Sequence, residues 1–395
     1  MTVSLHTVSP RFLRQIGNAL RYWQGKTAQI NDFNLAVLEA DRPNLVHVVR
    51  YAMLADELAI EAARLVVQSF QLAERRGNQA EWMALIRQLL LVVPAEHPLH
   101  VRLQDHLAML YRLGGQADEA IRLHTTALGE AEAIGATAEA AIICFNLGYD
   151  YFDAHKYTQA RAFAEEAHRR RVALSARHHA GLNNLFGLIL LRTNENKAAM
   201  EEFEKAAHEF EVCGDIAYAA RARLNMALCA EALGEYVEAL ALYDQIDAQL
   251  ATIDNQLDRQ QVIINRGTVW GRMGEWDKAL ATFLSADFPY LRRLGHKPYL
   301  AMLSTNLGFT FMHQHELGIA EEYLREAVAL WRGISNSLML ANSLGTLAQV
   351  LALQKQPAEA RLLLDEALTL LSNYPDDAWA RKLARQFAEL RDQLI

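Results

Sequence analysis

Three columns of small residues, repeated in phase, constrain this sequence more than any other feature. A first small residue recurs every 39 to 41 positions, an alanine follows it after twelve residues, and a third small or apolar residue follows seven later. The first column is Ala108, Gly148, Gly187, Ala227, Gly267, Gly308 and Ala348; the second is Ala120, Ala160, Ala199, Ala239, Ala279, Ala320 and Ala360; the third is Ala127, Ala167, Ala206, Ile246, Ala286, Ala327 and Ala367. This spacing predicts pairs of amphipathic helices that approach closely at the small residues.

The columns resemble those of the tetratricopeptide repeat family. The resemblance covers residues 101–372 and extends in a degenerate form back to residue 57. It implies an all-α fold: a right-handed α-solenoid of antiparallel helix pairs, wound into a superhelix whose concave groove is lined by the first helix of each pair. The family's usual period is 34 residues. The longer period here is typical of repeat arrays in bacterial regulators.

We predict three sections of the chain. They are an N-terminal helical section at 1–56, a solenoid of one degenerate and seven clear repeats at 57–375, and a capping helix at 376–395. Pro10 after Ser9 is typical of a helix start, so a first helix is expected over 9–24. A second is expected over 31–40, with a break at Asp41-Arg42-Pro43 before a further helix at 44–54.

Composition narrows the range of partners and locations. The chain has 395 residues, of which 52% are hydrophobic, and a net charge of −8. An acidic balance argues against nucleic acid as the partner. Cys144, Cys213 and Cys229 lack metal-ligand spacing and are interpreted as reduced thiols. No basic-then-apolar leader is present, and the longest apolar run, Leu185–Leu191, is too short to span a bilayer. We therefore expect a cytoplasmic protein with no membrane contact.

Asparagine recurs two residues before the first small residue. This column reads His106, Asn146, Leu185, Asn225, Asn265, Asn306 and Thr346. Asparagine is a poor helix former, so its recurrence inside helices calls for a reason. A carboxamide both donates and accepts, which suits clamping the backbone of an extended peptide, as members of the resembled family do. Alternatively, each amide bonds to the neighbouring repeat and fixes helix packing. Both interpretations stay open at this stage.

Groove-facing positions one and five residues after the small residue complete the candidate site. We predict partner-binding residues Asn146, Tyr149, Arg221, Asn225, Asn265, Thr268, Asn306, Phe309 and His313. Arg221 would contact an acidic residue or a free carboxylate of the ligand. The clamp that some family members use for chaperone C-termini needs Lys and Asn in consecutive repeats. Leu185 interrupts that pattern, so this clamp is not expected.

No motif indicates chemistry. Gly25-Lys26-Thr27 resembles the end of a P-loop, but Leu20 replaces the required glycine and no buried strand precedes it. His178-His179 and His313-x-His315 lack the spacing of a zinc site. The basic cluster His168–Arg171 is interpreted as a solvated turn. We therefore predict no catalytic residue, no metal and no cofactor, and expect that the protein is not an enzyme.

Three hypotheses about function follow. The leading one is a non-catalytic scaffold or sensor in bacterial signalling that captures a peptide or protein segment. Residues 38–45, LEADRPNL, resemble the entry into the helical sensor of bacterial signal-transduction ATPases. Those proteins carry a nucleotide-binding domain ahead of the repeats. No such domain is expected in this sequence, so the resemblance implies either a stand-alone sensor module or a fragment of such a system. The alternative is a peptide-gated, quorum-sensing-type regulator that acts on a response regulator through residues 1–56. The third is self-association through the apolar ends of the solenoid.

Overall fold

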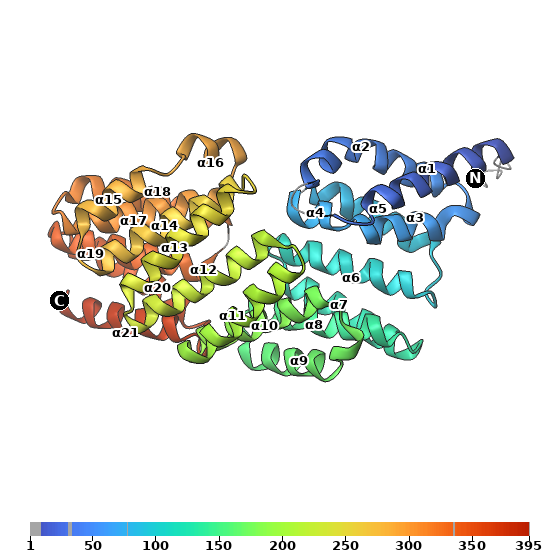
Figure 1. Cartoon of the computed structure of the whole chain (residues 1–395). Coiled ribbons are helices and arrows are strands. Elements are labelled where there is room, and N and C mark those ends of the chain that lie inside the picture. Colours follow the sequence, from blue (N-terminus) through green and yellow to red (C-terminus); the bar gives the residue numbers. More distant parts are fainter. Residues whose placement is uncertain (1–8, 31–33, 77, 335, 395) are drawn as a thin grey trace, which may run out of the picture. The chain divides into compact units, whose positions relative to one another are not determined.

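The computed structural model describes residues 9–30, 34–76, 78–334 and 336–394 (Figure 1). Over these ranges the chain forms 21 α-helices and one short 3-10 helix, with no strand. It divides into two compact units: Met1–Leu185 with Glu209–Asp215, the first unit, and Phe186–His208 with Ile216–Ile395, the second unit. Successive helices pack against each other in pairs within each unit. The predicted all-α solenoid of helix pairs is confirmed.

Nine helices lie entirely within the first unit. They are α1 (Pro10–Thr27), α2 (Leu35–Ala52), α3 (Asp56–Ser69), α4 (Gln71–Arg76), α5 (Gln79–Val92), α6 (Pro98–Leu113), α7 (Ala117–Ala133), α8 (Thr137–Asp153) and α9 (Tyr157–Arg169), and the 3-10 helix Arg171–Ala173 follows them. The residues of α10 (Ala176–Arg192) and α11 (Asn196–Val212) are divided between the units.

Ten helices lie entirely within the second unit. They are α12 (Ile216–Leu233), α13 (Tyr236–Ala251), α14 (Gln256–Arg272), α15 (Trp276–Leu284), α16 (Phe288–Leu294), α17 (Lys297–His313), α18 (Leu317–Ile334), α19 (Ser337–Leu353), α20 (Pro357–Leu371) and α21 (Ala378–Gln393). In α6–α9, α12–α15 and α17–α20 a first helix alternates with a second helix that packs against it, as the spacing predicts.

The small residues lie where paired helices touch. A Cβ on Gly267 would come within 2.3 Å of the Phe283 ring, and a Cβ on Gly308 would lie 2.5 Å from Leu324. The alanines twelve positions later are completely buried. A larger side chain at any of these positions would force the helices apart, because interiors are close-packed. The prediction that these columns mark helix contacts is confirmed.

The N-terminal helices partly differ from the prediction. Ser9 caps α1, its Oγ accepting from Phe12 N at 3.2 Å, as expected. The predicted break at Asp41-Arg42-Pro43 is wrong, because α2 continues through Pro43. Buried Leu38 and Leu45 lie on either side of the proline, so one continuous helix keeps both in the core. This burial outweighs the single backbone hydrogen bond that proline cannot donate. Residues 31–33, the predicted start of this helix, lie outside the described residues.

One hydrophobic cluster joins the N-terminal helices to those that follow. Leu20 of α1, Leu45 of α2 and Trp82 of α5 belong to it, together with Leu107 of α6. Both α1 and α2 pack against α3. The helices α1 and α2 therefore share their core with the helices that follow them. The boundaries at 56 and 375 stay predictions.

Two local features interrupt the regular pairing. The second helix of the repeat that begins with α14 ends at Leu284, and Ala286 of the third column lies in the short link before α16. Asp287 caps α16 by accepting from Tyr290 N at 2.9 Å, and Pro289 occupies its first turn. Gly295 ends α16 with a φ of 67°, which favours glycine.

Candidate functional site

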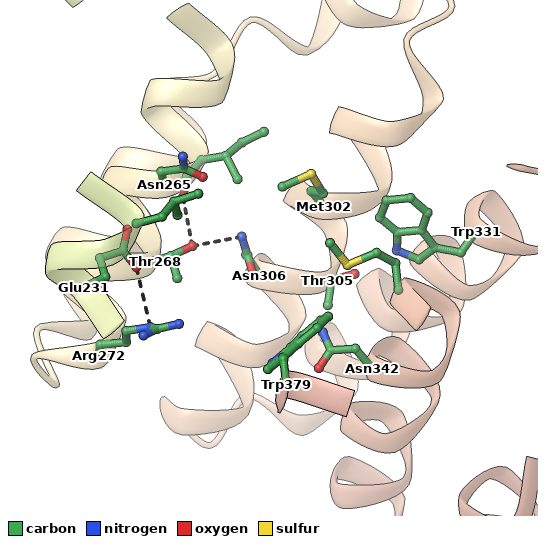
Figure 2. A pocket seen from close by; sticks show the side chains of 13 residues that line it. Glu231, Asn265, Thr268, Arg272, Met302, Thr305, Asn306, Trp331, Asn342 and Trp379 are labelled. Atoms are coloured by element: carbon green, nitrogen blue, oxygen red, sulfur yellow. Dashed lines mark hydrogen bonds and ion pairs between the residues drawn. The ribbon is translucent and has the colours of Figure 1, made fainter. Parts of the chain in front are cut away.

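A cavity of about 180 Å³ opens in the second unit (Figure 2). It is lined by Leu228, Glu231, Ile264, Asn265, Thr268, Arg272, Met302, Thr305, Asn306, Trp331, Met339, Asn342 and Trp379. Most of these residues come from the first helices α12, α14, α17 and α19, as the family resemblance implies for a ligand-facing surface. Trp331 comes from α18 and Trp379 from α21. Three of the nine predicted site residues, Asn265, Thr268 and Asn306, meet here.

The helical repeat explains why these side chains converge. Asn265, Thr268 and Arg272 are three and four residues apart on α14, and therefore share one face of that helix. Met302 and Asn306 share the equivalent face of α17. Since α14 and α17 are neighbours, the two faces form adjoining parts of one wall.

The two asparagines of this wall differ in their hydrogen bonds. Asn306 Nδ2 donates to Thr268 Oγ1 at 3.3 Å, and the Thr268 hydroxyl donates to the Ile264 carbonyl at 3.0 Å. Asn306 thus links two repeats, as the packing interpretation expects. Asn265 is 7% exposed; its Nδ2 makes no hydrogen bond of normal geometry within the described part of the chain, although its amide lies close enough to the Tyr243 hydroxyl to oppose the rise in the pKa of that group. A buried amide without a partner costs free energy, so Asn265 is the better candidate for a ligand contact.

A carboxylate and a guanidinium face each other at one side of the cavity. Glu231 is buried, accepts from Tyr243 Oη at 2.5 Å and lies 3.7 Å from Arg272 Nε. Burial raises the pKa of Glu231 to about 6, although the Tyr243 hydrogen bond and Arg272 oppose the rise. In Figure 2 this pair lies at the left and Trp331 at the right. The two charges offset each other, which leaves the remaining lining uncharged.

Two predicted residues lie farther along α17. Phe309 and His313 follow Asn306 by three and seven residues and so share its face. The His313 ring stacks on Trp276 with centroids 4.0 Å apart, and Phe309 contacts both rings edge-on, at 5.9 Å from Trp276 and 4.6 Å from His313. Phe309 remains 38% exposed. These aromatic residues are available at the surface but do not line the cavity.

Arg221 and Asn225 lie on α12 and are not among the cavity residues. Arg221 contacts Asp258 through Nε at 2.9 Å and through Nη2 at 3.3 Å. A ligand carboxylate at Arg221 would have to compete with this internal partner. Asn225 is half-buried.

In the first unit the predicted residues make internal contacts. Asn146 Nδ2 donates to Asp105 Oδ1 at 2.5 Å, across neighbouring repeats. Tyr149 Oη donates to the Gly181 carbonyl at 2.9 Å and accepts from Asn184 Nδ2 at 3.0 Å. These contacts match the packing interpretation of the asparagine column.

Asp105 belongs to a buried charged group that sequence reasoning missed. His124 lies between two carboxylates, with Nδ1 2.5 Å from Asp150 and Nε2 3.3 Å from Asp105. Burial disfavours the imidazolium, but the hydrogen bonds to Asp105 and Asp150 outweigh it and raise the pKa of His124 to about 9. Arg112 Nε, 3.2 Å from Asp150, adds a second positive charge. No ligand can reach His124, which is completely buried. The group therefore holds α6, α7 and α8 together.

The described residues contain no group of three or more His, Cys, Asp or Glu side chains that could hold a metal ion. Within the same ranges, every helix is too short or too polar to cross a membrane.

Sequence comparison connects the repeats to a family. The tetratricopeptide repeat model matches residues 299–373, which cover almost all of α17 and the three helices after it. This part of the chain matches the tetratricopeptide repeat family. No curated protein matches the sequence.

Solved structures support the repeat fold over most of the protein. Aspartyl phosphate phosphatase F from Bacillus subtilis is 14% identical with a TM-score of 0.57, over 92% of this chain and 95% of that one. NprR in complex with its cognate peptide NprX is 13% identical with a TM-score of 0.54, over 74% and 84%. A signal transduction ATPase with a tetratricopeptide repeat sensor, from Pyrococcus horikoshii, is 12% identical with a TM-score of 0.53, over 86% of this chain and 52% of that one. At such low sequence identities, these similarities show only that the chain shares the repeat fold.

Several cavity residues of the repeat protein lay outside the predicted site. Trp331 belongs to a second helix, and only first helices were expected to face a ligand. Trp379 lies in the segment 376–395, for which only a capping role was predicted. Asn342 lies one turn before the asparagine column, where Thr346 stands. All six tryptophans lie within four residues of a helix end, so that position does not single out Trp331 and Trp379.

Proposed function

We propose that this tetratricopeptide repeat protein is a non-catalytic scaffold or sensor in bacterial intracellular signalling, and that it holds a peptide or protein segment at the cavity of the second unit. One observation carries the proposal: the buried Asn265 Nδ2 lines the cavity and makes no hydrogen bond of normal geometry with the described residues. A backbone carbonyl of a bound segment would supply that acceptor. The gain is largest at a buried donor that is otherwise unpaired.

The similar structures support this proposal by analogy. NprR was solved with its cognate peptide, and the signal transduction ATPase from Pyrococcus horikoshii has a tetratricopeptide repeat sensor. Both share only the fold with this chain. Recognition of an extended segment by carboxamides also suits the chemistry here, because Asn265, Asn306 and Asn342 line one cavity.

The test is selection of binding peptides from a random displayed library, followed by calorimetric affinities for one selected peptide. We expect the double variant Asn265→Ala/Asn306→Ala to weaken binding by about 1–3 kcal/mol for each lost amide contact. Asn373→Ala, at an exposed position of the same unit, is the matched control. Equal affinities of the double variant and the control would contradict a carboxamide clamp.

A second candidate is a peptide-gated regulator that acts on a response regulator. The observation in its favour is the likeness to aspartyl phosphate phosphatase F over nearly the whole chain. The core that α1 and α2 share with α3 and α6 speaks against an N-terminal section that works independently. The assay would follow loss of the acyl phosphate from phosphorylated response regulators of the source organism. A decay rate unchanged by the full chain would exclude this activity for the proteins tested.

A further inference from the structure

The cavity is made partly by the C-terminal helix. Trp379, near the start of α21, lines it together with Trp331 of α18. Asp377 is 1% exposed and fixes the start of α21, since its Oδ1 accepts from Ala380 N at 2.9 Å. Its other carboxylate oxygen lies 3.8 Å from Arg192 of α10, within the same unit. Farther along, Phe387 lies against Gly345 of α19. Trp379 is therefore held in a defined position before any ligand arrives.

The lining is largely apolar and has no unbalanced charge. Leu228, Ile264, Met302 and Met339 join the two indoles, while Glu231 and Arg272 are paired with each other. A charged group that entered would be desolvated without a free counter-charge, which is costly. An apolar group would gain from burial against sulfur and aromatic surfaces.

The polar lining limits the ligand further. The Thr268 and Thr305 hydroxyls donate to carbonyls of their own helices, at 3.0 Å and 2.8 Å. The Asn265 amide lies near the Tyr243 hydroxyl but remains a buried donor without a hydrogen bond of normal geometry in the described residues. Cavities of about 150 Å³ can bind a group the size of benzene, and this one measures about 180 Å³. One apolar side chain would fit the volume of the cavity, and one carbonyl oxygen would accept a hydrogen bond from the Asn265 amide.

We propose that the cavity is a specificity pocket for a single uncharged apolar side chain, with Trp379 of α21 as a wall of the pocket and Asn265 as donor to the adjoining carbonyl. This inference rests on the proposed function, because it names what the bound segment places in the site. It makes α21 a part of the binding site as well as the end of the repeat array.

The experiment uses three small probes with the full-length chain: N-acetyl-leucine N-methylamide, the lysine equivalent and the glycine equivalent. Binding is followed through the indole N–H signals in ¹⁵N NMR spectra, assigned by single Trp→Phe variants. We expect saturable shifts at Trp331 and Trp379 with the leucine probe, and binding of the lysine and glycine probes that is weaker by roughly ten- to hundredfold. Equal binding of the three probes would overturn the proposal without any variant.

Trp379→Ala should abolish the leucine response at Trp331. The control Trp276→Ala removes an indole of the same unit that does not line the cavity, and should leave the response intact. Circular dichroism checks that both variants fold; if Trp379→Ala does not, Trp379→Leu should retain a weakened response. The two proposals can fail separately. Asparagine-dependent peptide binding with no leucine response would reject the pocket alone, whereas a leucine response without such binding would reject the peptide function alone.

Discussion

His124 Nδ1 lies 2.5 Å from Asp150 Oδ2, and both side chains are completely buried. The second ring nitrogen faces Asp105, so one imidazolium bridges carboxylates from α6 and α8. A buried charge is tolerated only with such partners. This arrangement makes the stability of the first unit depend on pH and on a single histidine.

The first prediction concerns that pH dependence. The pKa of His124 is about 9 in the folded chain, against about 6.5 when unfolded. Its stabilising contribution is therefore complete below about pH 6.5 and is lost as the pH rises through about 9. We expect the urea midpoint of the first unit to fall over this range. His124→Gln should remove most of that slope and cost about 3–5 kcal/mol at neutral pH, whereas exposed His47→Gln should change neither. A wild-type midpoint that stays constant up to pH 10 would contradict the assignment.

The second prediction separates packing asparagines from a ligand-binding one. Asn146→Ala removes a donor from buried Asp105 and should cost about 1.5–3 kcal/mol of folding stability. Asn265→Ala removes an amide nitrogen that makes no hydrogen bond among the described residues, so its cost should be well under half of that. Chemical denaturation of both variants measures the difference. Equal losses would show that Asn265 also serves packing.

The third prediction concerns the close approach of α14 and α15. Gly267→Ala places a Cβ about 2.3 Å from the Phe283 ring, and should destabilise the second unit by about 1–3 kcal/mol. Adding Phe283→Leu should recover part of the loss. The control is Gly129→Ala inside α7, where a Cβ meets nothing within 4 Å and the better helix former should be neutral or stabilising. Thermal melts compare the three variants, and an unaffected Gly267→Ala would refute the steric reading.

The fourth prediction tests the helix that runs through a proline. Pro43 is exposed inside α2, so its replacement by alanine should remove little packing. Pro43→Ala restores a donor toward the Glu39 carbonyl and should stabilise the chain by up to about 3 kcal/mol, less a few tenths to 1 kcal/mol for the greater freedom of the unfolded chain. The melting temperature is the readout. A lower melting temperature would mean that the proline relieves strain here.

The fold could be predicted because one constant distance, twelve residues from small residue to alanine, recurs in seven repeats. Predictions of helix boundaries from single residues were less reliable. Pro43 signals a helix break, but the burial of Leu38 and Leu45 decides otherwise. The site was harder still, because the role of each asparagine depends on a residue about one repeat away. Asn146 donates to Asp105 and Asn306 donates to Thr268, whereas Asn265 Nδ2 makes no hydrogen bond of normal geometry in the described residues. No column of identical residues reveals that difference.

The contact between Gly345 and Phe387 limits which repeats can be removed from this array or added to it. A Cβ at position 345 would lie within 2.0 Å of the Phe387 ring, so the C-terminal helix fits only onto a first helix with glycine there. The corresponding positions in the other clear repeats hold Asp105, Phe145, Asn184, Leu224, Ile264 and Thr305. Any shortened or lengthened version of the protein must therefore transplant the final repeat and its terminal helix together, since no internal repeat can seat that helix.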